Sequence, residues 1–359
     1  MEKRRIYFLD IARTFAIISI VLCHSVELIY YPNNLDSWTH LSVQSKIFRT
    51  IFFTIGRLGV PIFLFITGYL TLNKKIDSDE DCTKFYKRNL IPLLITTEIW
   101  IILYNVFLSV LNNKSFDIIA TIKNMLFVEK VPLMNMWYMP MIIGIYIAIP
   151  FVSKIVKQFS IKSLKYPIII ILALQFLLPT VNVLLKIFGR TQYSNILDLS
   201  FFGGIYGIYV VCGFFVSKGC MKKIKNKWII LSIVVSFMLS CVIQILSYVK
   251  GIGYNIWYNS IFLFICTLCT FELFTRINTE KINKKLLNLF TYISKISLAI
   301  FFLHIIFEKA FIKYIKALEI SNPLKVFMLF TLSFGISTIL VFVLSKIKII
   351  KNKIFLVKE

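Results

Sequence analysis

Ten apolar stretches of about 20 residues each constrain the fold of this chain more than any other feature of its sequence. An α-helix needs about 20 apolar residues to cross the hydrocarbon core of a bilayer, and one water-soluble core cannot bury ten such stretches. Of the 359 residues, 58% are hydrophobic and 16% are charged, whereas about 25% are charged in a soluble domain. The sequence therefore predicts an all-α integral membrane protein with about ten transmembrane helices in one bundle. The expected spans lie near residues 6–29, 47–72, 89–111, 135–156, 164–186, 199–217, 228–249, 254–274, 289–312 and 324–345.

The distribution of basic residues predicts the orientation of the bundle. With the N-terminus inside, 26 of the 41 lysine and arginine residues lie in cytoplasmic segments, as the positive-inside rule requires. We therefore expect both termini in the cytoplasm, with residues 1–345 as one transmembrane domain and residues 346–359 as a short basic tail. The same distribution accounts for most of the formal net charge of +24. Nucleic acid is therefore not an expected partner, whereas membrane lipids are.

The seven cysteines lie mostly within apolar stretches, where cysteine behaves as a small hydrophobic residue. Cys266 and Cys269 form a C-x-x-C pair, but no histidine or further cysteine lies near them in the sequence to complete a metal site. The first apolar stretch contains Asp10 and Arg13 and lacks a small-residue cleavage site, so it is expected to be a retained span. The sequence predicts neither a disulfide framework nor a metal site.

The first span carries Asp10, Arg13 and His24, whose side chains are costly to bury in a membrane. On an α-helix, Arg13 and His24 project within roughly 20° of each other, and Asp10 lies about 60° from Arg13. A charged group at membrane depth costs roughly 2.5 kcal/mol or more, so this stripe should face the bundle interior or a wet cavity. We predict that the stripe forms the active centre.

Basic residues in and beside the next two spans allow two interpretations each. Arg57 lies deep in the second span, near a proline and several glycines, either in a kinked packing helix or facing the site. Lys84, Lys87 and Arg88 precede the third span. They either anchor the inner surface or bind the phosphates of an anionic cofactor.

Aromatic and histidine residues mark the outer half of two later spans. Trp137 and Tyr138 open the fourth span, where they form either an interfacial aromatic belt or a platform on which a sugar ring stacks. The ninth span carries Ser297 and His304, and His304 should reach roughly the depth of His24. Such a histidine is either a hydrogen-bonding helix contact or a member of the site.

Several of these motifs together resemble the membrane acyltransferase-3 family, over nearly the whole chain. The motifs are Leu9-Asp10-Ile11-Ala12-Arg13 followed by His24, Val60-Pro61 through Thr67-Gly68-Tyr69, Trp137-Tyr138 leading to Pro150, and Ser297 through His304. The resemblance implies about ten helices, a cytoplasmic acyl-CoA donor and an extracytoplasmic glycan acceptor, such as capsule, exopolysaccharide, O-antigen, peptidoglycan or a lipid-linked glycan. Acetyl is the family's commonest acyl group, so acetyl-CoA is the expected donor. The bacterial cytoplasmic membrane is the expected location.

The sequence departs from the family pattern at three positions. Thr67 stands where serine is usual and keeps the hydroxyl group. Asn135 stands where many members have a histidine two residues before the tryptophan, so that histidine is missing on the acceptor side. Asn89 stands where a second arginine often precedes the proline, which leaves Lys84 and Lys87 as the neighbouring cations for the cofactor phosphates.

Acyl transfer from a thioester to a sugar hydroxyl needs a base and a group that stabilises the developing oxyanion. His24 is the predicted base. Arg13, about 16 Å nearer the cytoplasm along the helix, is predicted to hold the cofactor or the acyl carbonyl, with Asp10 holding Arg13 through a bidentate pair. Arg57 is expected to complete the cofactor pocket. The candidates for substrate binding are Thr67, Trp137, Tyr138, Ser297 and His304.

Two other functions remain open at this point. A transporter or exporter of a glycan or lipid-linked sugar would also carry intramembrane arginine, aspartate and histidine, for proton coupling. A non-catalytic membrane scaffold would not need these residues. Acyl-CoA-dependent labelling of a glycan in proteoliposomes separates the acyltransferase from both alternatives.

Overall fold

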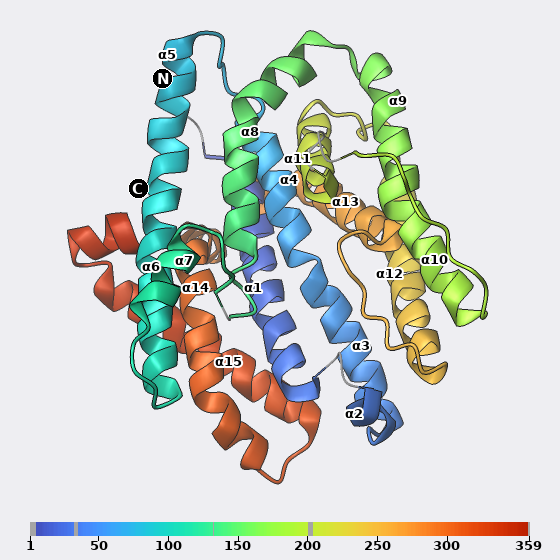
Figure 1. Cartoon of the computed structure of the whole chain (residues 1–359). Helices are drawn as coiled ribbons and strands as arrows, with labels where there is room; N and C mark the ends of the chain where they lie inside the picture. Colours follow the sequence, from blue (N-terminus) through green and yellow to red (C-terminus); the bar gives the residue numbers. More distant parts are fainter. Residues whose placement is uncertain (1–4, 32–34, 132, 200–203, 358–359) are drawn as a thin grey trace.

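The computed structural model describes residues 5–31, 35–131, 133–199 and 204–357. Within these ranges the regular elements are helices and no strand occurs, so the predicted all-α fold is confirmed (Figure 1). Eight helical stretches are long and apolar enough to cross a membrane: Tyr7–Tyr30, Val43–Thr71, Asp79–Leu111, Tyr138–Gln158, Ile161–Ile187, Asn226–Val249, Lys284–Ala317 and Asn322–Leu344. Two shorter apolar helices, Gly204–Ser217 and Ile261–Thr275, lie at the expected sixth and eighth spans. Residues 200–203 of the sixth expected span lie outside the described residues.

The ten spans comprise helices of different lengths. The first four consist of α1 (Tyr7–Tyr30), α3 (Val43–Arg57) with α4 (Gly59–Thr71), α5 (Asp79–Phe85) with the π-turn η1 (Tyr86–Leu90) and α6 (Ile91–Leu111), and α8 (Tyr138–Gln158). The others are α9 (Ile161–Leu172) with η2 (Ala173–Leu177) and α10 (Leu178–Ile187), then α11 (Gly204–Ser217), α12 (Asn226–Val249), α13 (Ile261–Thr275), α14 (Lys284–Ala317) and α15 (Asn322–Leu344). Short helices α2 (Leu35–Thr39) and α7 (Ile118–Met125) lie in the predicted outer loops, and η4 (Thr279–Lys281) precedes α14.

Helix α1 lies at the centre of the bundle (Figure 1). It packs against α3, α4, α13, α14 and α15. Small and apolar side chains such as Ala16 and Val21 are completely buried in these contacts. The polar stripe is also inside the protein, with Asp10 only 3% and His24 only 7% exposed. The high cost of a lipid-facing charge is the physical reason for this orientation.

Pro61 breaks the second span between α3 and α4. Proline has no backbone N–H, so the carbonyl of Arg57, four residues earlier, has no helical partner there. The backbone N–H of Leu58 turns back to the carbonyl of Ile55 at 3.1 Å. Arg57 is therefore the last residue of α3 and lies at the break.

Two glycines beside this break allow α3 and α4 to touch the backbone of α1. A Cβ atom at Gly56 would lie 2.7 Å from Cα of Cys23, and one at Gly59 would lie 2.5 Å from the carbonyl oxygen of Ala16. Any larger residue would push the helices apart, because non-bonded atoms do not approach this closely. The proline and glycines of this span allow either close packing or a local break, and the structure shows both.

The C-terminal segment packs against α6. The indole Nε1 of Trp100 donates to the Ile354 carbonyl at 2.8 Å, and the Thr96 hydroxyl donates to the Lys353 carbonyl at 2.6 Å. These acceptors belong to the π-turn η5 (Ile350–Ile354), and the next residue, Phe355, is only 2% exposed. The segment expected as a basic tail is therefore attached to the bundle by these two hydrogen bonds and by the burial of Phe355.

Candidate active site

His24, Glu27 and Arg57 form a chain of hydrogen bonds between α1 and α3. Nδ1 of His24 lies 2.9 Å from Oε2 of Glu27, and Nη2 of Arg57 donates to Oε1 of Glu27 at 2.6 Å. The three side chains are 9%, 13% and 8% exposed. Residues three apart share a helix face, which brings Glu27 to His24, and the end of α3 supplies the arginine.

This chain determines which nitrogen of His24 is available for proton transfer. A carboxylate only accepts hydrogen bonds, so Nδ1 of His24 carries a proton and donates it to Glu27. In the neutral imidazole, Nε2 then carries the lone pair, and it has no hydrogen-bond partner among the described residues. A carboxylate behind the imidazole also stabilises the imidazolium that forms when Nε2 accepts a proton. The arrangement suits a general base.

His304 of α14 lies against the ring of His24. The two ring centroids are 5.4 Å apart and the planes differ by 25°. Nδ1 of His304 donates to the carbonyl of Ile300 at 2.9 Å, whereas its buried Nε2 has no partner in the part of the chain that the structure describes. The structure therefore brings together two histidines that are 280 residues apart in the sequence.

A second carboxylate, Glu308, lies one helical turn beyond His304. It is completely buried, and the hydroxyl of Ser25 donates to its Oε1 at 2.6 Å. Neither Glu27 nor Glu308 was among the site residues predicted from the sequence. The three-residue spacing from His24 could have identified Glu27, but the position of Glu308 depends on the packing of α14 against α1.

Aromatic rings surround the guanidinium group of Arg57. Its Cζ lies 4.6 Å from the ring centroids of Phe53 and Trp257 and 5.6 Å from that of Tyr258. Its Nη1 donates to the Tyr258 hydroxyl at 3.4 Å. The ring of Trp137 joins this cluster, 5.7 Å from Trp257 and 5.5 Å from Tyr258. Such contacts stabilise a cation where little water reaches it.

A cavity of about 240 Å³ lies between α1, α4, α8 and α14. Its lining includes four residues that the sequence predicted for the site: Arg13, Thr67, Tyr138 and Ser297. Ile20 lines the same cavity, one helical turn before His24. The cavity therefore follows α1 from Arg13 towards the imidazole, and it is lined mainly by apolar side chains.

Comparison with known families agrees with this geometry. A family model described as an acyltransferase domain, Acyl_transf_3, matches residues 6–345. The chain belongs to the acyltransferase-3 family. No curated protein and no solved structure matches the chain. The ten-helix bundle is therefore that of a membrane acyltransferase, and neither a transporter nor a scaffold is needed to explain its buried charges.

In this acyltransferase, Asp10 pairs with Arg5, and the predicted bidentate pair with Arg13 is wrong. Nε and Nη2 of Arg5 donate to the two carboxylate oxygens at 2.7 and 3.0 Å, and the Ser294 hydroxyl donates to Oδ1 at 2.7 Å. Arg5 precedes α1 and can turn back over its first residues, whereas the side chain of Arg13 lies in the cavity. The carboxylate thus joins the start of α1 to α14.

The other predicted residues divide between two places. Arg57 lies with Glu27 beside His24, and the cavity lining that includes Arg13 does not include it. Lys84, Lys87 and Arg88 are exposed on α5 and η1, on the segment that leads into α6. Because α6 contributes a residue to the Arg13 cavity, these three cations lie at the end of a helix that reaches the site.

Asn135 is one of the three expected departures from the family pattern. Its Nδ2 lies 3.1 Å from the Tyr104 hydroxyl and 3.2 Å from the Phe301 carbonyl, and it donates to both. The residue is only 1% exposed. Asn135, which precedes α8, therefore connects α6 and α14 through the hydrogen bonds of its amide group.

Proposed function

We propose that this acyltransferase moves an acetyl group from cytoplasmic acetyl-CoA to a hydroxyl of a surface or exported polysaccharide. The position of His24 supports the proposal most: its available Nε2 lies about one turn beyond a cavity that contains Arg13. One helix thus carries a cation for an anionic donor and, about 16 Å further along, a base for a hydroxyl acceptor. We also propose that both termini are cytoplasmic in a bacterial membrane, so that Arg13 lies towards the donor side.

The proposed transfer uses His24 as base and then as acid. Nε2 of His24 takes the proton of the acceptor hydroxyl while that oxygen attacks the thioester carbonyl carbon. The C–S bond breaks, and the imidazolium returns the proton to the CoA thiolate, which leaves an ester and free CoA. Glu27 stabilises the transient imidazolium, and Arg57 holds Glu27 in position. His304 packs against the imidazole and limits its rotation.

The donor would lie in the cavity beside Arg13. The hydroxyl groups of Thr67 and Ser297 each donate to a carbonyl of their own helix at 2.9 Å, so their oxygen atoms can still accept hydrogen bonds from amide groups of the CoA arm. The exposed Lys84, Lys87 and Arg88 would bind its phosphates. Tyr138 lines the same cavity, while Trp137 lies in the aromatic cluster near His24 and faces the acceptor half of the proposed route.

Two measurements together test this function. Deleting the gene is expected to remove ester-linked acetyl groups from the surface polysaccharide, measured by mild alkaline release. Proteoliposomes that contain the purified protein should transfer label from acetyl-CoA to the de-esterified polysaccharide. Unchanged ester content combined with no labelled polysaccharide would contradict the proposal. If the protein transferred label only from a longer acyl-CoA, the identity of the donor would change, but the proposed acyl transfer would stand.

Removing the guanidinium of Arg13 is expected to weaken donor binding. Arg13→Ala should raise the Kd for acetyl-CoA at least tenfold, because one charge-assisted hydrogen bond contributes roughly 1.5–3 kcal/mol. Arg13→Lys keeps the charge and should lose less. Titration of the detergent-solubilised protein with acetyl-CoA measures both values. An unchanged Kd in Arg13→Ala would assign Arg13 a structural role.

A further inference from the structure

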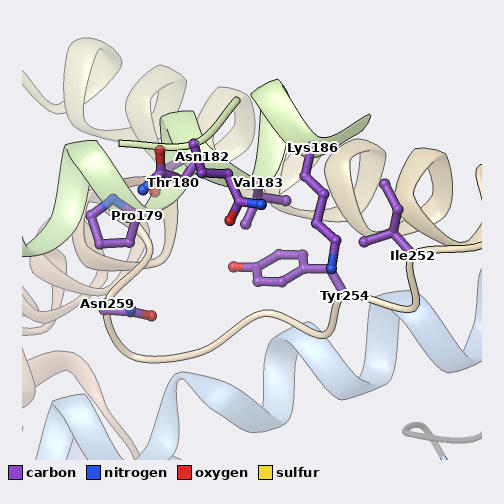
Figure 2. A pocket seen from close by; sticks show the side chains of 9 residues that line it. Pro179, Thr180, Asn182, Val183, Lys186, Ile252, Tyr254 and Asn259 are labelled. Carbon is purple, nitrogen blue, oxygen red and sulfur yellow. The ribbon is translucent and has the colours of Figure 1, made fainter. Parts of the chain in front are cut away.

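A second cavity, of about 380 Å³, lies along α10 and is lined by residues from Pro179 to Lys186 of that helix. Figure 2 shows Asn182, Val183 and Lys186 on α10 at one side and Tyr254 and Asn259 on the loop after α12 at the other. Both helices end on the side that the charge distribution assigns to the cell exterior. Its size falls within the range of small-molecule sites, about 300–1,000 Å³.

The lining of this outer cavity combines polar and apolar side chains and carries no carboxylate. It contains amide groups of Asn182, Gln192 and Asn259 and the ammonium group of Lys186. Among the described residues, the side chains of Lys186, Gln192 and Asn259 make no hydrogen bond, so they are available to a ligand. Amides and an ammonium group present both donors and acceptors, as recognition of closely spaced sugar hydroxyls requires.

The frame of the cavity is held in place by hydrogen bonds between side chains of α10 and the backbone of other segments. Both polar atoms of the Asn182 amide bind the backbone of Tyr193, with distances of 2.7 and 2.9 Å. The Thr180 hydroxyl accepts from the backbone N–H of Ile261 at 3.0 Å, which joins α10 to the start of α13. The site is therefore built by several elements that fix its shape before a ligand arrives.

One loop, residues 250–260, connects this cavity to the active-site chain. Tyr254 and Asn259 line the cavity. Trp257 and Tyr258 of the same loop lie over the guanidinium of Arg57, which holds Glu27 behind His24. Asn259 and Tyr258 are adjacent, and neighbouring Cα atoms are about 3.8 Å apart. A ligand held by Asn259 would therefore contact the loop whose next residues pack on Arg57.

Tyr254 adds an aromatic surface to the polar lining. Burial raises the pKa of its phenol to about 12, although hydrogen bonds to the Trp257 backbone and the Ser260 side chain lower it, so the hydroxyl stays protonated near neutral pH. A flat ring with a polar tip suits a sugar, which has apolar C–H faces and hydroxyl edges.

We propose that this outer cavity is the binding site for the acceptor glycan, held by Lys186, Gln192, Tyr254 and Asn259. The loop 250–260 then positions the bound chain towards His24. The inference rests on the proposed function, because it names the place where the acceptor of that reaction binds.

Binding and transfer measured separately test this site. The probe is the de-esterified surface polysaccharide from a strain that lacks the gene, titrated against purified protein in nanodiscs. The double variant Lys186→Ala, Asn259→Ala is expected to bind it at least tenfold more weakly, with acetyl-CoA affinity unchanged. Val183→Trp, which fills the cavity without removing a polar group, should have the same effect. Lys250→Ala, an exposed lysine of the same loop outside the cavity, is the matched control.

The outcomes separate this inference from the proposed function. Wild-type affinity in both the double variant and Val183→Trp would overturn the acceptor site, even if the protein transfers acetyl groups. Absence of polysaccharide binding by the wild-type protein would overturn it as well. Weakened binding in the variants combined with no acetyl transfer by the wild type would keep the glycan site and reject the proposed reaction. Unchanged thermal unfolding of each variant shows that the fold is intact.

Discussion

Replacing His24 with glutamine is expected to lower the rate of acyl transfer by roughly 10²- to 10⁴-fold, the usual contribution of a general acid–base group. Glutamine keeps a polar side chain beside Glu27 but has no nitrogen that accepts a proton near neutral pH. The rate of label transfer from acetyl-CoA to polysaccharide in proteoliposomes measures the effect. The affinity for acetyl-CoA should be nearly unchanged, because Nε2 of His24 acts on the acceptor.

His40 offers a matched control for this substitution. It is exposed and lies after α2 in the predicted outer loop, so His40→Gln should transfer acetyl groups at the wild-type rate. Both variants should accumulate in the membrane to the same level, which immunoblotting of membrane fractions checks. Wild-type transfer by His24→Gln would reject His24 as the base.

Replacing Arg57 with methionine is expected to destabilise the fold by about 3–5 kcal/mol, the usual result of breaking a buried ion pair from one side. The substitution leaves the carboxylate of Glu27 in the bundle without the hydrogen bond of 2.6 Å from Nη2. It also removes a cation from a site enclosed by Phe53, Trp257 and Tyr258. The expected result is a strong decrease in folded protein, measured by fluorescence-detected size exclusion.

A second substitution separates stability from catalysis at this pair. Adding Glu27→Gln to Arg57→Met removes the unpaired charge, so the double variant should recover most of the lost folded protein. It should still transfer acetyl groups slowly, because His24 then lacks the carboxylate that stabilises its protonated form. If the double variant recovered both the folded protein and the wild-type rate of acetyl transfer, a catalytic role for Glu27 would be contradicted. Unchanged accumulation of the single variant would show that the ion pair does not stabilise the fold.

The sequence alone determined the fold class and part of the site. Apolar length is a local property that the bilayer constrains directly, so each of the ten expected spans has a helical counterpart within the described residues. Helical periodicity is also local, and it placed Asp10, Arg13 and His24 on one face of α1. The eighth span was less well predicted. Helix α13 starts at Ile261 rather than near residue 254, because polar and glycine-containing residues form the loop before it.

Only the tertiary structure decided which partner each of these side chains contacts. Asp10 binds Arg5 rather than Arg13, and His24 contacts Glu27 and stacks on His304. A buried polar group must have a hydrogen-bond partner. The sequence offers several possible partners at a similar membrane depth and does not distinguish between them. The choice depends on how α3 breaks at Pro61 and on how closely glycines let it approach α1. Contacts between helices far apart in the chain are a property of their packing, and only the folded bundle determines that packing.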